Sequence, residues 1–109
     1  MKRFLGTALI VTALIGCASP PHFCRRENGQ ATLYLRQPDA KDVQLVASSE
    51  GFRPRPAQKT TAGLWAASVS GSEEFTYFYL VDGKMLLPPC DQREADDFGG
   101  SNCLFVPVK

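Results

Sequence analysis

The sequence predicts an all-β sandwich, in which two antiparallel sheets pack face to face. Short runs rich in β-branched and aromatic residues recur at a spacing of about 8–12 residues, and turn residues separate them. No segment beyond residue 30 keeps the apolar period of about 3.6 residues that marks a helix. The chain has 109 residues, which is enough for one small domain.

Six segments carry the strand pattern, namely residues 31–36, 43–47, 64–69, 75–81, 85–87 and 103–108. In the first segment Leu33 and Leu35 share one face, as a half-buried strand requires. Asp82-Gly83 predicts a two-residue hairpin turn, because both positions tolerate a positive φ. Pro107 places the last strand partly at a sheet edge, since proline donates no ladder hydrogen bond.

The N-terminus predicts export. Lys2 and Arg3 precede an apolar run over residues 4–15, which is too short to span a bilayer, since spanning takes about 20 residues. The run ends in Leu14-Ile15-Gly16-Cys17, which resembles the lipobox of bacterial lipoproteins. The resemblance implies that residues 1–16 are removed and that the sulfur of Cys17 receives a diacylglycerol. A signal anchor with a chance cysteine is the alternative.

Residues 17–30 are therefore expected to be the lipidated cysteine and a tether, followed by the sandwich over residues 31–109. Pro20 and Pro21 favour an extended backbone. Several acyl chains give a durable membrane anchor, whereas one chain alone is marginal. By resemblance to lipoprotein sorting rules, the lack of Asp directly after Cys17 favours the outer membrane, with the domain facing the periplasm or the cell surface.

Three further cysteines lie in the expected tether and domain: Cys24, Cys90 and Cys103. A bond between Cys90 and Cys103 would close a short loop, worth about 3 kcal/mol in the chain-entropy picture. Cys24 could compete for either partner or pair with a second chain. No two of the three are close enough for a CxxC metal or redox site.

The strand series resembles the early-set, immunoglobulin-like sandwich of the family 48 carbohydrate-binding modules, which includes the glycogen-binding domain of AMP-activated protein kinase and the N-terminal domains of isoamylases. The resemblance covers residues 31–109 and depends on four motifs, which are Pro38-Asp39-Ala40 with Val43 and Leu45, Gly63-Leu64-Trp65, Tyr77-Phe78-Tyr79-Leu80-Val81-Asp82-Gly83, and Asp97-Phe98-Gly99-Gly100-Ser101-Asn102. It implies an early-set β-sandwich, and it places Trp65 at a core position.

The sugar-binding positions of that family match less well. Phe52 is kept, but Arg53 stands for an asparagine and Arg55 for a stacking tryptophan. Met85 stands for the second stacking tryptophan. Of the final polar pair only Asn102 remains. Arginine can stack through its planar guanidinium and methionine offers a soft contact, but neither replaces an indole platform.

We therefore expect a non-catalytic binding module with a degenerate glucan site, and an envelope protein is favoured over a glycan as its partner. The alternative is a carbohydrate-binding lipoprotein that uses Arg55, Met85 and Asn102. Residues 75–81 carry aromatic side chains on both faces, so one face packs the core and the other is either a partly exposed patch or covered.

Other functional classes are disfavoured. With 12 basic and 11 acidic residues, the chain lacks the basic excess of a nucleic-acid-binding domain. The single histidine, His22, falls in the expected tether, so no histidine-based triad is expected in the domain. Two segments are expected to be solvated loops. They are residues 51–63, with Arg53, Arg55 and Lys59, and residues 91–102, with Asp91, Glu94, Asp96 and Asp97. No enzyme activity, cofactor or metal site is expected.

Overall fold

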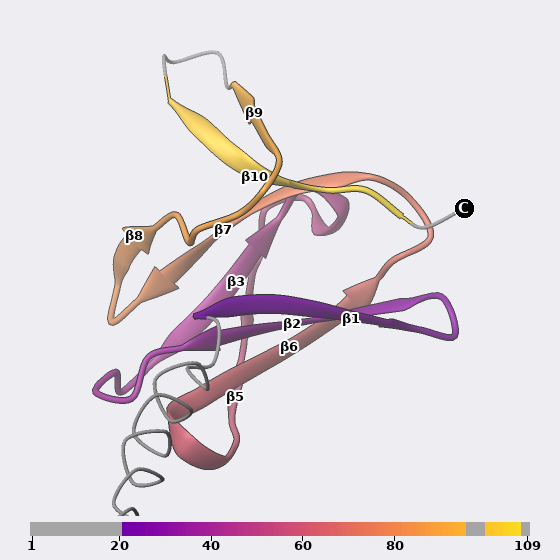
Figure 1. The fold of residues 1–109 in the computed structure, drawn as a ribbon. Coiled ribbons are helices and arrows are strands. Elements are labelled where there is room, and N and C mark those ends of the chain that lie inside the picture. Colours follow the sequence, from indigo (N-terminus) through magenta and orange to yellow (C-terminus); the bar gives the residue numbers. More distant parts are fainter. Residues whose placement is uncertain (1–20, 96–99, 108–109) are drawn as a thin grey trace, which may run out of the picture.

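The computed structural model describes residues 21–95 and 100–107. Within them the predicted all-β fold is confirmed: the strands form two antiparallel sheets that pack as a sandwich compatible with an immunoglobulin-like fold (Figure 1). The expected signal peptide, Cys17, Pro20, residues 96–99 and the end of the predicted last strand lie outside the described residues.

The first sheet has four strands in the order β1-β2-β6-β5. Their bounds are β1 His22–Glu27, β2 Gln30–Arg36, β6 Leu64–Ser70 and β5 Gln58–Lys59. The register sets Leu33 opposite Ala67 and Leu35 opposite Trp65. These four side chains point into the sandwich and are buried, as the alternation in the sequence predicts.

The second sheet has the order β4-β3-β7-β10-β9, with β8 also paired to β7. The bounds are β3 Val43–Ala47, β4 Pro54–Pro56, β7 Phe75–Val81, β8 Lys84–Leu86, β9 Arg93–Ala95 and β10 Ser101–Phe105. Two short 3₁₀ turns, η1 Ser48–Glu50 and η2 Thr61–Gly63, lie in the connections. Because β7 pairs with β3, β8 and β10, it is the centre of this sheet.

One apolar core lies between the sheets. Every second residue of β7 points inward, so Phe75, Tyr77 and Tyr79 are buried. The other sheet and the remaining strands complete the cluster with Ala31, Leu33, Leu35, Ala40, Val43, Leu45, Ala47, Trp65, Ala67, Val69, Cys103 and Phe105.

Asp82-Gly83 forms the predicted two-residue turn between β7 and β8. Both residues have positive φ, 49° and 83°, and Val81 pairs with Lys84 across the turn. The Asp82 carboxylate also accepts hydrogen bonds from the backbone N–H groups of Lys41 and Asp42, at 2.9 and 2.8 Å. The turn is thus tied to the segment that leads into β3.

The structure differs from the sequence-based expectation in the connecting segments. Strand β1 lies within the expected tether, because Asn28-Gly29 forms a second tight turn, with φ values of 51° and 76°, that folds it onto β2. The expected loop over residues 51–63 contains β4 and β5, and the loop over 91–102 contains β9. Strands β4, β5 and β9 are each short and form their hydrogen bonds with a longer neighbouring strand.

Candidate functional site

The outward surface of the second sheet is the first candidate site, and we call it the outer face. On β7 the outward residues are Thr76, Phe78 and Leu80, all half-buried. Apolar side chains of neighbouring strands share this surface, because residues directly opposite each other in a sheet point to the same side. Val46 lies opposite Phe78 and Pro54 lies opposite Val46, while Met85 lies opposite Leu80 and Leu104 opposite Thr76.

The outer face is apolar at its centre and open at its edge. Val46 is only 3% exposed, whereas Met85 is 59% exposed. Phe78, Leu80 and Leu104 are half-buried. Of the two alternatives for this face of β7, partial exposure therefore applies to its one aromatic residue, Phe78.

Two of the four predicted ligand-binding residues lie on the outer face. Met85 is on β8, and Asn102 is on β10 opposite Glu94 of β9, one residue before the buried Cys103. Arg55 is on β4, where its Nε donates to Glu50 at 2.8 Å and its Nη2 to the other carboxylate oxygen. This ion pair raises the pKa of Arg55 and lowers that of Glu50 through the hydrogen bond they share.

The four predicted residues do not converge on one point. Strands β3 and β7 separate β4 from β8, and three strand spacings of about 4.8 Å place Arg55 roughly 14 Å from Met85. Arg53 and Arg55 instead line a shallow groove beside β4 with Ser49, Glu50, Pro54 and Pro56. Glu50 holds the Arg55 guanidinium in this groove through the bonds to Nε and Nη2.

Trp65 is a core residue and not a surface platform. It is 7% exposed, and its Nε1–H donates to the carbonyl of Gln37 at 2.9 Å. The ammonium of Lys59 lies 5.8 Å from the ring centroid. Lys59 thus lies on the first sheet against Trp65, whereas Arg53 and Arg55 line the groove beside β4 of the second sheet.

A second candidate is a groove of about 560 Å³ at the open side of the sandwich, between β1 and the C-terminal strand. We call it the side groove, and it is lined by His22, Phe23, Cys24, Arg26, Tyr77, Pro89, Cys90, Asp91, Gln92, Leu104, Phe105 and Val106. Arg26 crosses it, because Nη2 donates to the Val106 carbonyl at 3.0 Å and its guanidinium lies 4.7 Å from the Phe105 ring centroid.

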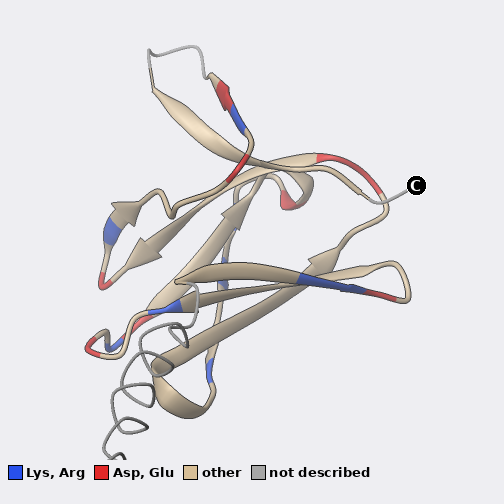
Figure 2. Ribbon diagram, in the orientation of Figure 1, with Lys and Arg blue, Asp and Glu red and all other residues tan. Residues whose placement is uncertain are grey.

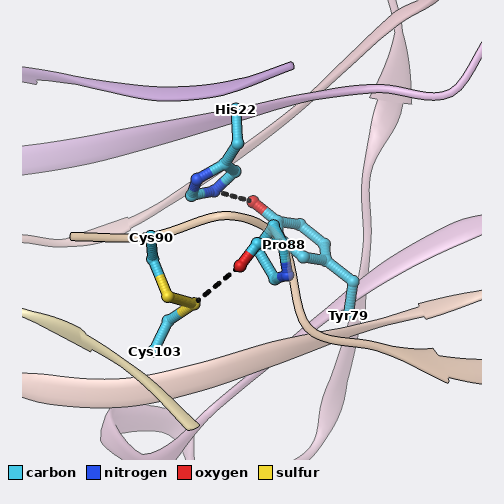
Figure 3. The surroundings of a disulfide bond; sticks show 5 residues. All are labelled: His22, Tyr79, Pro88, Cys90 and Cys103. Atoms are coloured by element: carbon cyan, nitrogen blue, oxygen red, sulfur yellow. Dashed lines mark hydrogen bonds between the residues drawn. A yellow bond between two sulfur atoms is a disulfide. The ribbon is translucent and has the colours of Figure 1, made fainter. Parts of the chain in front are cut away.

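His22 lies at one end of the side groove, and its Nε2 is 3.0 Å from the Tyr79 hydroxyl (Figure 3). Burial lowers the pKa of His22 to about 4, and a hydrogen bond to the backbone of Pro89 only partly opposes this. The imidazole is therefore neutral at pH 7. Since a neutral ring has one N–H, Nε2 accepts from the Tyr79 hydroxyl when Nδ1 carries the hydrogen.

The groove does not activate a nucleophile. Burial raises the pKa of the Cys24 thiol, and the nearby Arg26 only partly opposes this shift. Burial also raises the pKa values of Tyr77 and Tyr79. Catalytic thiols need a lowered pKa and a partnered base, so this arrangement favours binding over covalent chemistry.

The disulfide joins Cys90 and Cys103, with a Cα–Cα distance of 5.9 Å, which confirms the pairing considered first, and Cys24 is the free thiol of the described residues (Figure 3). The Cys103 sulfur lies 3.6 Å from the Pro88 carbonyl oxygen. This is a packing contact, because a disulfide sulfur has no hydrogen to donate. The bond fixes the segment after β8 against β10 and so forms one wall of the side groove.

Sequence reasoning missed the side groove, because it placed His22 and Cys24 in a tether. The signal that predicts β1 is Asn28-Gly29, which is the strongest short-range mark of a hairpin. Acidic residues do not form a metal site in the part of the chain that is described. Asp96 and Asp97 lie outside that part.

The charged residues of the described surface do not gather into a patch of one sign. Figure 2 shows basic and acidic residues interspersed over turns and edge strands. Among the described residues, no helix is both long and apolar enough to cross a membrane. In comparisons with known proteins, no family model matches this chain and no curated protein matches its sequence.

Proposed function

We propose that this protein is a non-catalytic, lipid-anchored protein of the bacterial cell envelope, and that its sandwich binds a protein partner through the outer face. The observation that carries the proposal is the set of apolar side chains on that face: Phe78 and Leu104 are half-buried at its centre, and Met85 at its edge is 59% exposed. A contiguous apolar surface with polar residues at its border is typical of an interaction site.

The surface of the first sheet offers one polar position for comparison. There Thr32 and Ser68 lie opposite each other, and their hydroxyl groups are 2.8 Å apart. Phe23 and Tyr34 on the same sheet stack on each other, with ring centroids 4.7 Å apart. The polar pair on the first sheet therefore gives a matched control position for the apolar centre of the second.

The lipid anchor is supported by the lipobox-like sequence that ends at Cys17. An early-set fold related to family 48 carbohydrate-binding modules is supported by the confirmed two-sheet architecture and by the buried Trp65 of the Gly63-Leu64-Trp65 motif. A protein partner is favoured over a glucan because Arg55, which is paired with Glu50, lies three strands from Met85, so the two side chains do not form one sugar-binding platform.

Photo-crosslinking in living cells tests the partner. A benzoylphenylalanine at Phe78 should give one discrete adduct with an envelope protein, whereas the same residue at Ser68 should give none. The absence of an adduct at Phe78, together with polysaccharide pull-down that is lost in Met85→Ala, would instead support the carbohydrate-binding alternative. The anchor is tested separately by Cys17→Ser, which should lose the lipid mass and leave the detergent phase.

A further inference from the structure

The chain enters the sandwich beside a short segment with an exposed methionine, Met85. Pro21 is held to the first sheet, because the backbone N–H of Arg36 donates to its carbonyl at 2.9 Å. His22 follows at once, and its ring contacts the Tyr79 hydroxyl and the backbone of Pro89. The segment from Lys84 to Pro89 thus lies next to the point where the chain enters the fold.

The length of chain between the anchor and this point limits where the membrane can lie. Cys17 precedes Pro21 by four residues, and four extended residues reach at most about 14 Å. Strand β7 has seven residues, so its length of about 20 Å exceeds that reach. The end of the sandwich next to Pro21 therefore stays nearer to the acylated cysteine than the opposite end does.

The two ends of the sandwich differ in what they expose. The start of β1, the turn between β7 and β8 and the segment leading into β3 lie at one end, on the left of Figure 1. This end exposes Met85 and Pro89, and its charges are mixed, since Lys41 and Lys84 lie in the same turns as Asp39, Asp42 and Asp82. The opposite end includes the Asn28-Gly29 turn, whose Gly29 carbonyl accepts from Gly71, and the exposed acidic pair Glu73 and Glu74.

This composition suits the interfacial region of a bilayer. A methionine offers a flexible, polarisable apolar side chain, and lysines extend their ammonium groups to lipid phosphates. The carboxylate of Asp82 at the same turn already accepts two backbone hydrogen bonds, from Lys41 and Asp42. Both of these hydrogen bonds are accepted by Oδ1, so that oxygen faces the protein.

We propose that the end of the domain formed by Lys84, Met85 and Pro89 lies against the phospholipid surface, so that the anchor holds the sandwich in one orientation. The inference rests on the proposed lipid at Cys17. The bilayer contacts the Met85 edge of the outer face, and the apolar centre around Phe78 stays accessible to a partner. The Glu73-Glu74 end points away from the membrane.

The test uses the full-length lipoprotein in vesicles of phosphatidylcholine and phosphatidylglycerol at 4:1, with brominated acyl chains as the quencher. Met85→Trp places a reporter at the proposed contact, and Ser72→Trp places one in the exposed turn at the opposite end. The buried native Trp65 supplies the background in both variants. Pro89→Trp is a second reporter at the contact, in case Met85→Trp does not fold.

Emission from position 85 or 89 should be quenched several-fold more strongly than emission from position 72. Equal quenching at both ends, or stronger quenching at position 72, would overturn the proposed orientation. Intact mass of each protein reports the diacylglycerol at Cys17 independently. Protein that lacks this mass would refute the anchor and the orientation together, whereas acylated protein without selective quenching would refute the orientation alone.

Discussion

The imidazole Nε2 of His22 lies 3.0 Å from the hydroxyl of Tyr79 and joins the edge strand of one sheet to the central strand of the other. The ring also lies 5.6 Å from the Tyr79 ring and 5.8 Å from the Tyr77 ring, measured between centroids. These contacts bury a side chain that becomes charged in mild acid. The sandwich therefore contains a polar link between its sheets whose strength depends on protonation.

The free energy of unfolding should fall as the pH drops from 6.5 toward 4. Burial lowers the pKa of His22 from 6.5 to about 4, so between these values the unfolded chain binds more protons than the folded one. One proton limits the slope to about 1.4 kcal/mol per pH unit, and partial exposure of the ring reduces it. Urea denaturation at a series of pH values measures the effect. His22→Gln should flatten this part of the profile, and an unchanged profile would contradict the assignment.

Removal of the disulfide should lower the free energy of unfolding by about 3 kcal/mol, since the bond closes a loop with a sequence separation of 13. The double variant Cys90→Ala/Cys103→Ala makes this change without leaving a new thiol. Cys24→Ala is the control, because Cys24 is partly exposed and free. Denaturation under non-reducing conditions should show a large effect for the pair and a small one for Cys24. The reverse order would mean that Cys24 takes part in the bond.

The predictable strands are those whose side-chain pattern is decided by burial. Leu33 and Leu35 in β2, or Phe75, Tyr77 and Tyr79 in β7, alternate because one face meets the core. Strands β4, β5 and β9 carry no such pattern, since all their residues are exposed. They form because longer strands offer free hydrogen-bonding edges. The residues that determine these short strands therefore lie elsewhere in the chain, in their longer partners.

The candidate site residues also fall into those that the sequence predicts and those that it does not. Met85 and Asn102 were found through their positions relative to the Asp82-Gly83 turn and the last strand, and both lie on the outer face. Pairing of Arg55 with Glu50 was not predictable, because it depends on how η1 brings the carboxylate to β4. The side groove depends on β1, whose polar sequence resembles a tether until Asn28-Gly29 is recognised as a turn.

Trp65→Phe should lower the free energy of unfolding by about 1–3 kcal/mol, because the Gln37 carbonyl loses its donor in a nearly buried site. Trp65→Ala should cost about 3–5 kcal/mol, since it also leaves a cavity. Lys59→Ala is the control and should cost less than about 1 kcal/mol, because the ammonium over the ring is exposed. Urea denaturation followed by circular dichroism is needed, since Trp65 is the sole tryptophan. Equal effects for all three variants would show that Trp65 does not support the core.

Gly63→Ala should destabilise the fold much more than Gly51→Ala. Both glycines have positive φ, 73° and 68°, so an added Cβ costs about 1–2 kcal/mol of backbone strain at either position. At Gly63 the Cβ would also lie 2.7 Å from the Cα of Pro38, whereas at Gly51 it would meet nothing within 4 Å. Overpacking of this kind adds about 1–3 kcal/mol, because backbone must move to relieve it.

Thermal unfolding of the two variants, side by side, measures this difference. Gly63 also holds its neighbour, since its carbonyl accepts from the backbone N–H of Gln37 at 2.9 Å, so the backbone near Pro38 has little freedom to retreat. Equal losses in the two variants would mean that the close approach to Pro38 relaxes without cost. A larger loss at Gly63 would give a physical reason for the glycine of the Gly63-Leu64-Trp65 motif: a side chain there would separate the start of β6 from the end of β2.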